Sequence, residues 1–94
     1  MDKELKEMFN HFDITEDEID WVVQICPGLN IVDYSKARQC VINLIKAGYP
    51  KDDIGEYICI NPSFMMYDPE RLKVILTQIG GDISAKLKND PFII

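Results

Sequence analysis

The sequence holds three cysteines and one histidine, the residue types most typical of protein nucleophiles and zinc ligands: Cys26, Cys40, Cys59 and His11. The cysteines lie 14 and 19 residues apart, which matches no zinc-binding pair, and the only histidine is close to none of them in sequence. Each cysteine falls within an apolar stretch, a setting typical of small buried side chains in a reducing compartment. The sequence therefore predicts that the protein is not an enzyme and that it has no catalytic, metal-binding or cofactor-binding site.

Carboxylates form two short clusters, Glu16–Glu18 and Asp52–Asp53. Both clusters lie where helices are expected to begin, and negative charge in a first turn complements the helix dipole. We interpret them as helix-start residues, with metal binding as the alternative.

An internal repeat predicts the elements that position these residues. When the sequence is shifted by 35 residues, IDWVVQICPGLNIVD (residues 19–33) aligns with IGEYICINPSFMMYD (residues 54–68). Pro27 then meets Pro62 and Asp33 meets Asp68. A third, partial copy keeps the eight-residue interval from Ile83 to Pro91. Self-similarity at a fixed period of this length is typical of helical repeat proteins.

Each copy has the pattern of two helices. In the first copy, Thr15 and Glu18 form a capping box, and apolar residues follow at helical spacing up to Pro27, which ends the helix. Asp33 caps the second helix, and Gly48 ends it. We expect helices near residues 2–11, 15–26, 34–47, 51–60, 69–79 and 82–89, and no strand. We expect a core that includes Ile19, Val23, Leu44, Ile54, Ile58, Leu76 and Ile79.

The predicted fold is all-α, a short α-solenoid of ~35-residue helix–helix repeats within one domain, residues 1–94. Residues 1–12 form an N-terminal capping helix. Residues 13–47 and 48–81 form two repeats, and residues 82–94 form a partial third. No apolar run approaches the roughly 20 residues of a membrane helix. The N-terminus lacks the pattern of a signal peptide, so the expected location is cytoplasmic and no membrane partner is expected.

The copies resemble the repeat of the mitochondrial transcription termination factor (mTERF) family. The resemblance rests on GYPKDDIGEYICINPSFMMYDPERLKVILTQIGG (residues 48–81) and on DITEDEIDWVVQICPGLNIVDYSKARQCVINLIKAG (residues 13–48), and it covers roughly residues 12–94. It implies an α-solenoid related to nucleic-acid binding and to control of organellar gene expression.

The charge pattern favours a different partner. The net charge is −6, of which residues 1–33 contribute −7 and residues 34–94 contribute +1. A nucleic-acid-binding surface is usually basic, because phosphate neutralisation supplies much of its affinity. The sequence therefore favours a binding module that docks on a protein, in an interaction or regulatory role, and it indicates no small-molecule substrate.

One residue is the candidate contact for a protein partner. Trp21 aligns with Glu56 in the second copy, a position that should face solvent. Trp21 either packs against the N-terminal helix or is exposed as a contact anchor, since exposed tryptophan is typical of interface hot spots.

Nucleic-acid binding is the alternative function. The candidate contacts are basic residues of the second helices: Lys36, Arg38, Lys46, Arg71 and Lys73. Lys36 aligns with Arg71 and Arg38 with Lys73, so these charges recur, although a solvated helix face would show the same pattern. Residues 44–58 also have helix-turn-helix spacing, but a reading helix would then begin with Lys51, Asp52 and Asp53, and carboxylates there would repel phosphates.

Overall fold

The computed structural model describes residues 1–94 as an all-α domain without strands. The α-helices are α1 (Lys3–His11), α2 (Glu16–Ile25), α3 (Tyr34–Lys46), α4 (Ile54–Ile60), α5 (Pro69–Ile79) and α6 (Ile83–Asn89). Three short 3-10 helices join them, η1 (Pro27–Asn30), η2 (Lys51–Asp53) and η3 (Pro62–Met66). No helix is both long and apolar enough to cross a membrane.

Most of the α-helices have a short polar residue at the N-cap position. Thr15 accepts a hydrogen bond from the backbone N–H of Glu18 while the Glu18 carboxylate accepts one from the N–H of Thr15, which confirms the capping box. Asp33 caps α3 by accepting from the N–H of Ser35 at 2.8 Å, and Asp68 accepts from the N–H of Arg71. Each cap satisfies a backbone donor that the first helical turn leaves without a partner.

The helix expected over residues 51–60 is not α-helical throughout. Lys51–Asp53 forms a 3-10 turn, and the α-helix begins at Ile54. No side chain caps either segment, and the backbone N–H of Asp53 bonds to the carbonyl of Pro50. Without a capping oxygen, the tighter turn supplies the hydrogen bonds at this helix start.

The helices α2, α4 and α6 end in the same backbone geometry. Cys26, Asn61 and Asp90 each precede a proline, and their φ/ψ values are −139/75°, −136/70° and −139/88°. At each of the three, the backbone carbonyl accepts a hydrogen bond from the N–H three residues later. Proline removes the donor that would continue the helix and holds the preceding residue outside helical geometry.

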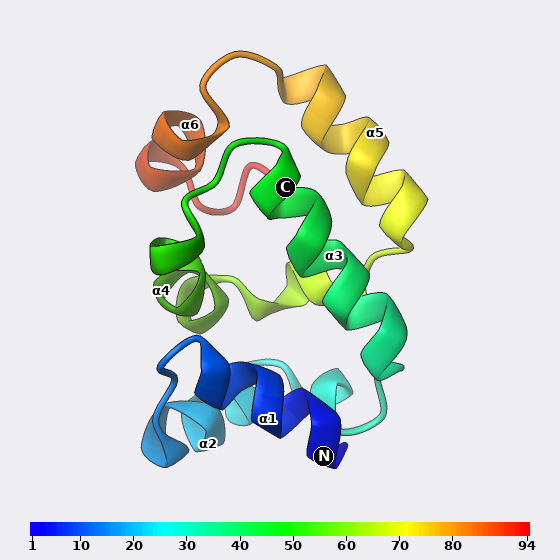
Figure 1. Ribbon diagram of the computed structural model, residues 1–94, viewed down its shortest axis with the longest axis vertical. Coiled ribbons are helices and arrows are strands. Elements are labelled where there is room, and N and C mark those ends of the chain that lie inside the picture. The colour runs from blue at the N-terminus through cyan, green and yellow to red at the C-terminus, as the bar shows by residue number, and fades with distance from the viewer.

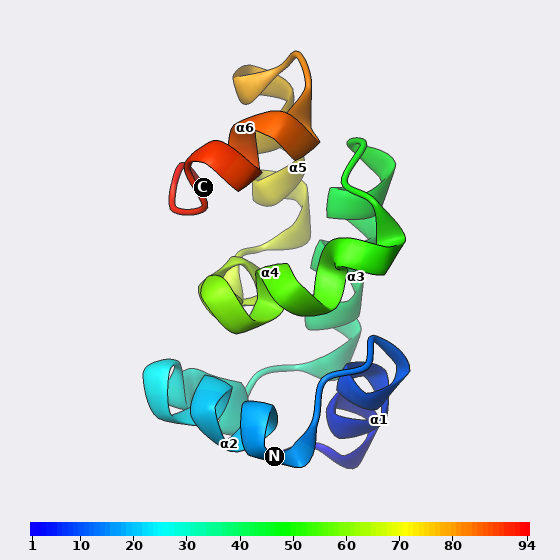
Figure 2. The ribbon, with the colours of Figure 1, turned by 90° about the vertical axis from the view of Figure 1, so that its left-hand side faces the viewer.

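The helices form two layers. α1, α3 and α5 follow one another along the long axis on one side, and α2, α4 and α6 do so on the other (Figures 1 and 2). The most extensive packing joins α3 to α5, and α1 contacts α3 while α2 contacts α4. The molecule measures 34 × 22 × 20 Å along its principal axes.

The core lies between these layers. Of the seven predicted core residues, five are buried: Ile19, Leu44, Ile54, Ile58 and Leu76. Val23 and Ile79 are only partly buried, so that part of the prediction is wrong. Val23 borders an open hollow beside the N-terminus, and Ile79 is the last residue of its helix, so neighbouring elements cover neither side chain completely.

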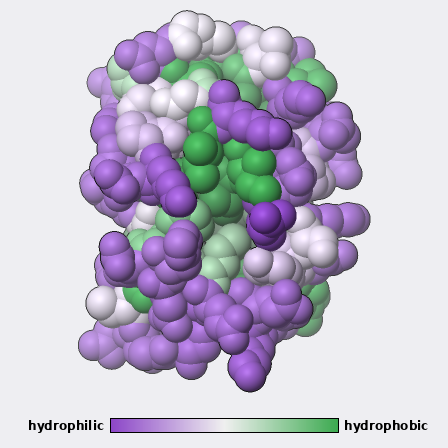
Figure 3. All heavy atoms as spheres, viewed as in Figure 1, coloured by the Kyte–Doolittle hydropathy of each residue, from purple (hydrophilic) through white to green (hydrophobic).

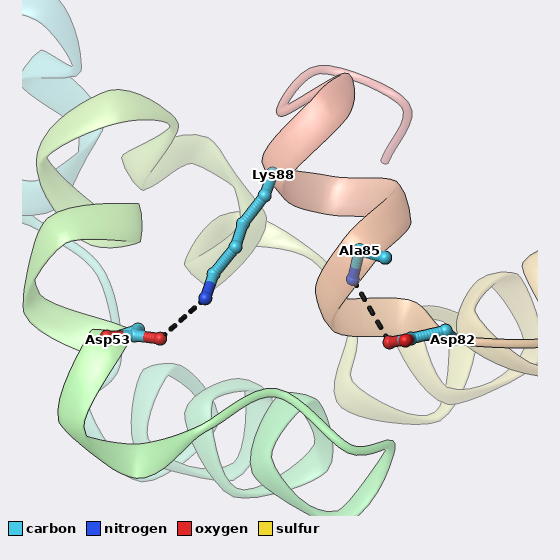
Figure 4. Close-up of polar contacts among 4 residues, drawn as sticks. All are labelled: Asp53, Asp82, Ala85 and Lys88. Carbon is cyan, nitrogen blue, oxygen red and sulfur yellow. Dashed lines mark hydrogen bonds and ion pairs between the residues drawn. The ribbon is translucent and has the colours of Figure 1, made fainter.

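Polar contacts attach α6 and the C-terminal residues to the middle of the molecule. The Tyr57 hydroxyl donates to the carbonyl of Pro91 at 2.7 Å, and the Asn61 amide donates to the same oxygen at 3.1 Å. Lys88 reaches from α6 to Asp53, with its Nζ 2.7 Å from the carboxylate Oδ2 (Figure 4). Tyr57 and Asn61 are buried, so these hydrogen bonds also satisfy polar groups that have left water.

Gly55 permits a close approach between two backbone segments. Gly55 lies in α4 against the link between α1 and α2, and a Cβ placed there would be 2.3 Å from the carbonyl oxygen of Phe12. Any larger residue would force α4 away from this link.

Candidate functional site

Trp21 lies on the outer side of α2. Its neighbours Ile19 and Val22 are buried, whereas Trp21 is 56% exposed and Ile25, one turn later, is 44% exposed. Asp17 and Glu18, one turn earlier, are also exposed. Residues three and four apart share a helix face, so α2 presents an apolar spot bordered by carboxylates. Trp21 is more than half exposed, so packing against the N-terminal helix does not account for its position.

Other exposed apolar side chains recur at the 35-residue interval. Ile25 and Ile60 are 44% and 40% exposed, and Ile31 and Met66 are 88% and 43% exposed. The Met66 side chain packs on η1, where a Cβ added to Gly28 would lie 2.8 Å from its Cε. Single exposed apolar residues are common, but these recur at matching positions of the two aligned segments.

The five basic residues proposed as nucleic-acid contacts are all exposed but do not share one face. Residues two apart on a helix point in directions about 160° apart, which separates Lys36 from Arg38 and Arg71 from Lys73. Arg38 borders a groove between α1 and α3, whereas Lys46 and Lys73 border a cleft between α3 and α5.

The cleft between α3 and α5 is mixed in charge. It encloses about 370 Å³, and Glu70 lines it together with Lys46 and Lys73. Asn43 at its base is 8% exposed and donates to the carbonyl of Pro69 at 2.9 Å, while Gln39 donates to the Asn43 oxygen at 3.0 Å. The hydrogen-bonding groups of the buried Asn43 amide are therefore paired within the protein and need no ligand as a partner.

The groove between α1 and α3, which we call the α1–α3 groove, is more apolar. It encloses about 460 Å³. Its apolar lining consists of Met8, Phe12, Tyr34, Val41, Ile42 and Ile45. The remaining lining residues are His11, Arg38 and Lys51. In Figure 3 a hydrophobic strip bordered by hydrophilic side chains crosses the middle of the face that shows α1, α3 and α5.

The cysteine thiols are poorly suited to nucleophilic chemistry. Burial, with the Asp68 carboxylate nearby, raises the pKa of Cys40 to about 11, and its thiol donates to the carbonyl of Tyr67. Burial and then Glu18, whose carboxylate lies 3.7 Å from the sulfur, raise the pKa of Cys59 to about 11. Burial also raises the pKa of Cys26. The thiolate is the nucleophile and the metal ligand, so all three thiols are held in the less reactive form.

The remaining candidates for chemistry are dispersed. The His11 ring packs edge-on against Phe12, with ring centroids 5.2 Å apart. No three His, Cys, Asp or Glu side chains lie close enough together to hold a metal ion. The three cysteines are free thiols.

The chain matches no protein-family model, no curated protein and no solved structure. Sequence reasoning missed the α1–α3 groove, to which α1 contributes His11 and the α3–α4 link contributes Lys51. The available signal was the apolar pair Ile42 and Ile45, which lie three residues apart on α3 and are only partly buried.

Proposed function

We propose that this chain is a small helical-repeat module that binds another protein and has no catalytic role. The observation that most supports the proposal is the outward position of Trp21, 56% exposed beside Ile25 and bordered by Asp17 and Glu18. Tryptophan supplies a large contact area with one polar group and is enriched in interface hot spots. The carboxylates favour a partner surface that combines an apolar pocket with basic residues.

The repeat architecture is part of the proposal. The interval of 35 residues relates α2 to η2 with α4, η1 to η3, and α3 to α5. The shared backbone geometry at Cys26, Asn61 and Asp90 supports residues 82–94 as a partial third unit. In this interpretation α1 covers the first unit, and the helices form a short α-solenoid like that of the mTERF family. Such stacks expose extended surfaces that serve in recognition.

The charge distribution favours a protein over a nucleic acid as the partner. The five candidate bases point in several directions, and the net charge of −6 disfavours approach to a polyanion. The helix-turn-helix alternative has a further difficulty, because four of the seven residues of α4 are buried. A reading helix must present its side chains to the DNA groove.

Nucleic-acid binding is the second candidate function, and one observation favours it. Arg38 and Lys73 occupy equivalent positions in the aligned segments. Arg38 on α3 borders the α1–α3 groove, and Lys73 on α5 borders the cleft between α3 and α5. A regular series of cations along a layer of helices could follow a phosphate backbone. The resemblance to the mTERF family points in the same direction.

Photo-crosslinking followed by affinity measurement tests the proposal. The photoreactive residue p-benzoylphenylalanine replaces Trp21 in one variant and exposed Ala85 on α6 in a control, and each is irradiated in extract from the source cells with and without nuclease. We expect a discrete protein adduct from position 21 alone. We also expect Trp21→Ala to weaken binding of the purified partner about 30-fold, or roughly 2 kcal/mol. Nucleic-acid adducts, or unchanged affinity of Trp21→Ala, would contradict the proposal.

A further inference from the structure

The α1–α3 groove combines an apolar floor with cationic borders. Six of its nine lining residues are apolar, and none is acidic. Arg38 comes from α3 and Lys51 from η2, and both are exposed. Four acidic residues adjoin lining residues in the sequence, but none is part of the lining: Glu7, Asp13, Asp33 and Asp52.

The two cations have no partner within the protein. The chain's two salt bridges join Lys6 to Glu16 and Lys88 to Asp53, and no side-chain hydrogen bond involves Arg38 or Lys51. Acids outnumber bases 16 to 10 in this chain, so a groove with two unpaired cations and no acid differs from the rest of the surface. The charge at the groove is thus available to a ligand.

We propose that the α1–α3 groove binds an acidic amphipathic α-helix of a partner protein. Apolar side chains on one face of that helix would pack on Ile42, Ile45 and Phe12. Its carboxylates would lie beside Arg38 and Lys51. A helix that docks in an apolar groove uses anchors at positions i, i+3, i+4 and i+7, and its charged flanks select the partner. The groove volume of about 460 Å³ is within the range of about 300–1,000 Å³ that is typical of protein ligand pockets.

The chemistry of the groove favours this occupant over nucleic acid. A phosphate backbone gains most of its affinity from cations and leaves an apolar floor uncovered. An amphipathic acidic helix satisfies both parts of the groove. The inference is independent of the proposed role of Trp21, because no residue of α2 lines the groove.

Two synthetic peptides of opposite charge test the inference. Both have about 18 residues and share leucines at i, i+3, i+4 and i+7, but one has glutamate and the other lysine on the polar face. Each is labelled with fluorescein and titrated with the full chain, and fluorescence anisotropy reports binding. We expect the glutamate peptide to bind at least about tenfold more tightly than the lysine peptide, with an affinity that falls between about 0.05 and 0.5 M salt.

Charge-reversal variants locate the binding site. The double variant Arg38→Glu, Lys51→Glu should weaken binding of the glutamate peptide by about tenfold or more. The control Lys36→Glu makes the same kind of change on exposed α3 surface outside the groove and should alter affinity by less than about twofold. All these positions are exposed, so the melting temperature of each variant should match that of the wild type.

Four outcomes would overturn the inference. The first is equal binding, or no binding, of the two peptides. The second is glutamate-peptide binding that the double variant does not weaken. The third is self-association of the unliganded chain, measured by sedimentation equilibrium and abolished by the double variant, because a second copy would then be the occupant. The fourth is binding of a labelled single-stranded oligonucleotide at Arg38 and Lys51 that is tighter than binding of the glutamate peptide. Nucleic acid, not a helix, would then be the ligand of the groove.

Discussion

Ile58 is the residue at which the packing of the two layers can be tested most simply. It lies in α4, has no exposed surface, and aligns with the partly buried Val23 of α2. Ile58→Ala removes three carbon atoms from the core. At about 0.8 kcal/mol for each buried methylene the lost transfer free energy is roughly 2.4 kcal/mol. A residual cavity adds to this, so the expected loss is about 2–5 kcal/mol.

This loss should be large on the scale of the whole domain. A chain of 94 residues has an unfolding entropy of roughly 200 cal/mol/K near its melting temperature. A loss of about 3 kcal/mol therefore lowers the melting temperature by roughly 15 °C. Circular dichroism at 222 nm, followed during heating and during urea titration, measures both quantities.

Val23→Ala is the matched control for this experiment. Val23 occupies the aligned position, loses two carbon atoms rather than three on truncation to alanine, and is only partly buried, so the change should cost less than about 1.5 kcal/mol. If Ile58→Ala melts within about 3 °C of the wild type, or if the control is equally destabilised, the assignment of the buried face of α4 is wrong.

Three further perturbations test particular contacts, each by urea or thermal unfolding. Gly55→Ala should destabilise the fold by about 1–3 kcal/mol, because its Cβ would meet the carbonyl oxygen of Phe12; unchanged stability would show that α4 is not held this close. Asp33→Ala should cost about 0.5–2 kcal/mol by removing the cap of α3, whereas Asp33→Asn, which keeps a capping oxygen, should cost much less. Burial raises the pKa of Tyr57 to about 12, whereas the unfolded phenol ionises near 10, so its contribution to stability is complete below pH 10 and is lost as the pH rises toward 12. Tyr57→Phe should therefore reduce the fall in the free energy of unfolding between these pH values, and an unaltered slope would show that Tyr57 is not responsible.

Most helix boundaries were predictable from the sequence because local chemistry sets them. Thr15 with Glu18, and Asp33 and Asp68, cap helices as expected, and Pro27 ends α2 as its chemistry requires. These effects depend on a few neighbouring residues, so they can be inferred without knowledge of the fold.

Degrees of burial and shared surfaces were less predictable because they depend on distant segments. Val23 and Ile58 align in the sequence, yet only Ile58 is fully covered. The repeat placed Arg38 and Lys73 at equivalent positions, but the hollow that each one borders depends on the packing of neighbouring helices: Arg38 lies at the α1–α3 groove and Lys73 at the cleft between α3 and α5. The α1–α3 groove forms only when α1 packs beside α3, so Lys51 could not be assigned to it from spacing alone.

The most direct test of the proposed function is binding to nucleic acid, measured against salt. Fluorescence anisotropy of labelled duplex and single-stranded oligonucleotides is recorded with the wild type and with a variant in which Lys36, Arg38, Arg71 and Lys73 are replaced by alanine. Because the chain has a net charge of −6, we expect no measurable duplex binding near about 0.15 M salt. Submicromolar duplex binding that weakens steeply with salt and is lost in the four-site variant would contradict protein docking as the function and support nucleic-acid recognition instead.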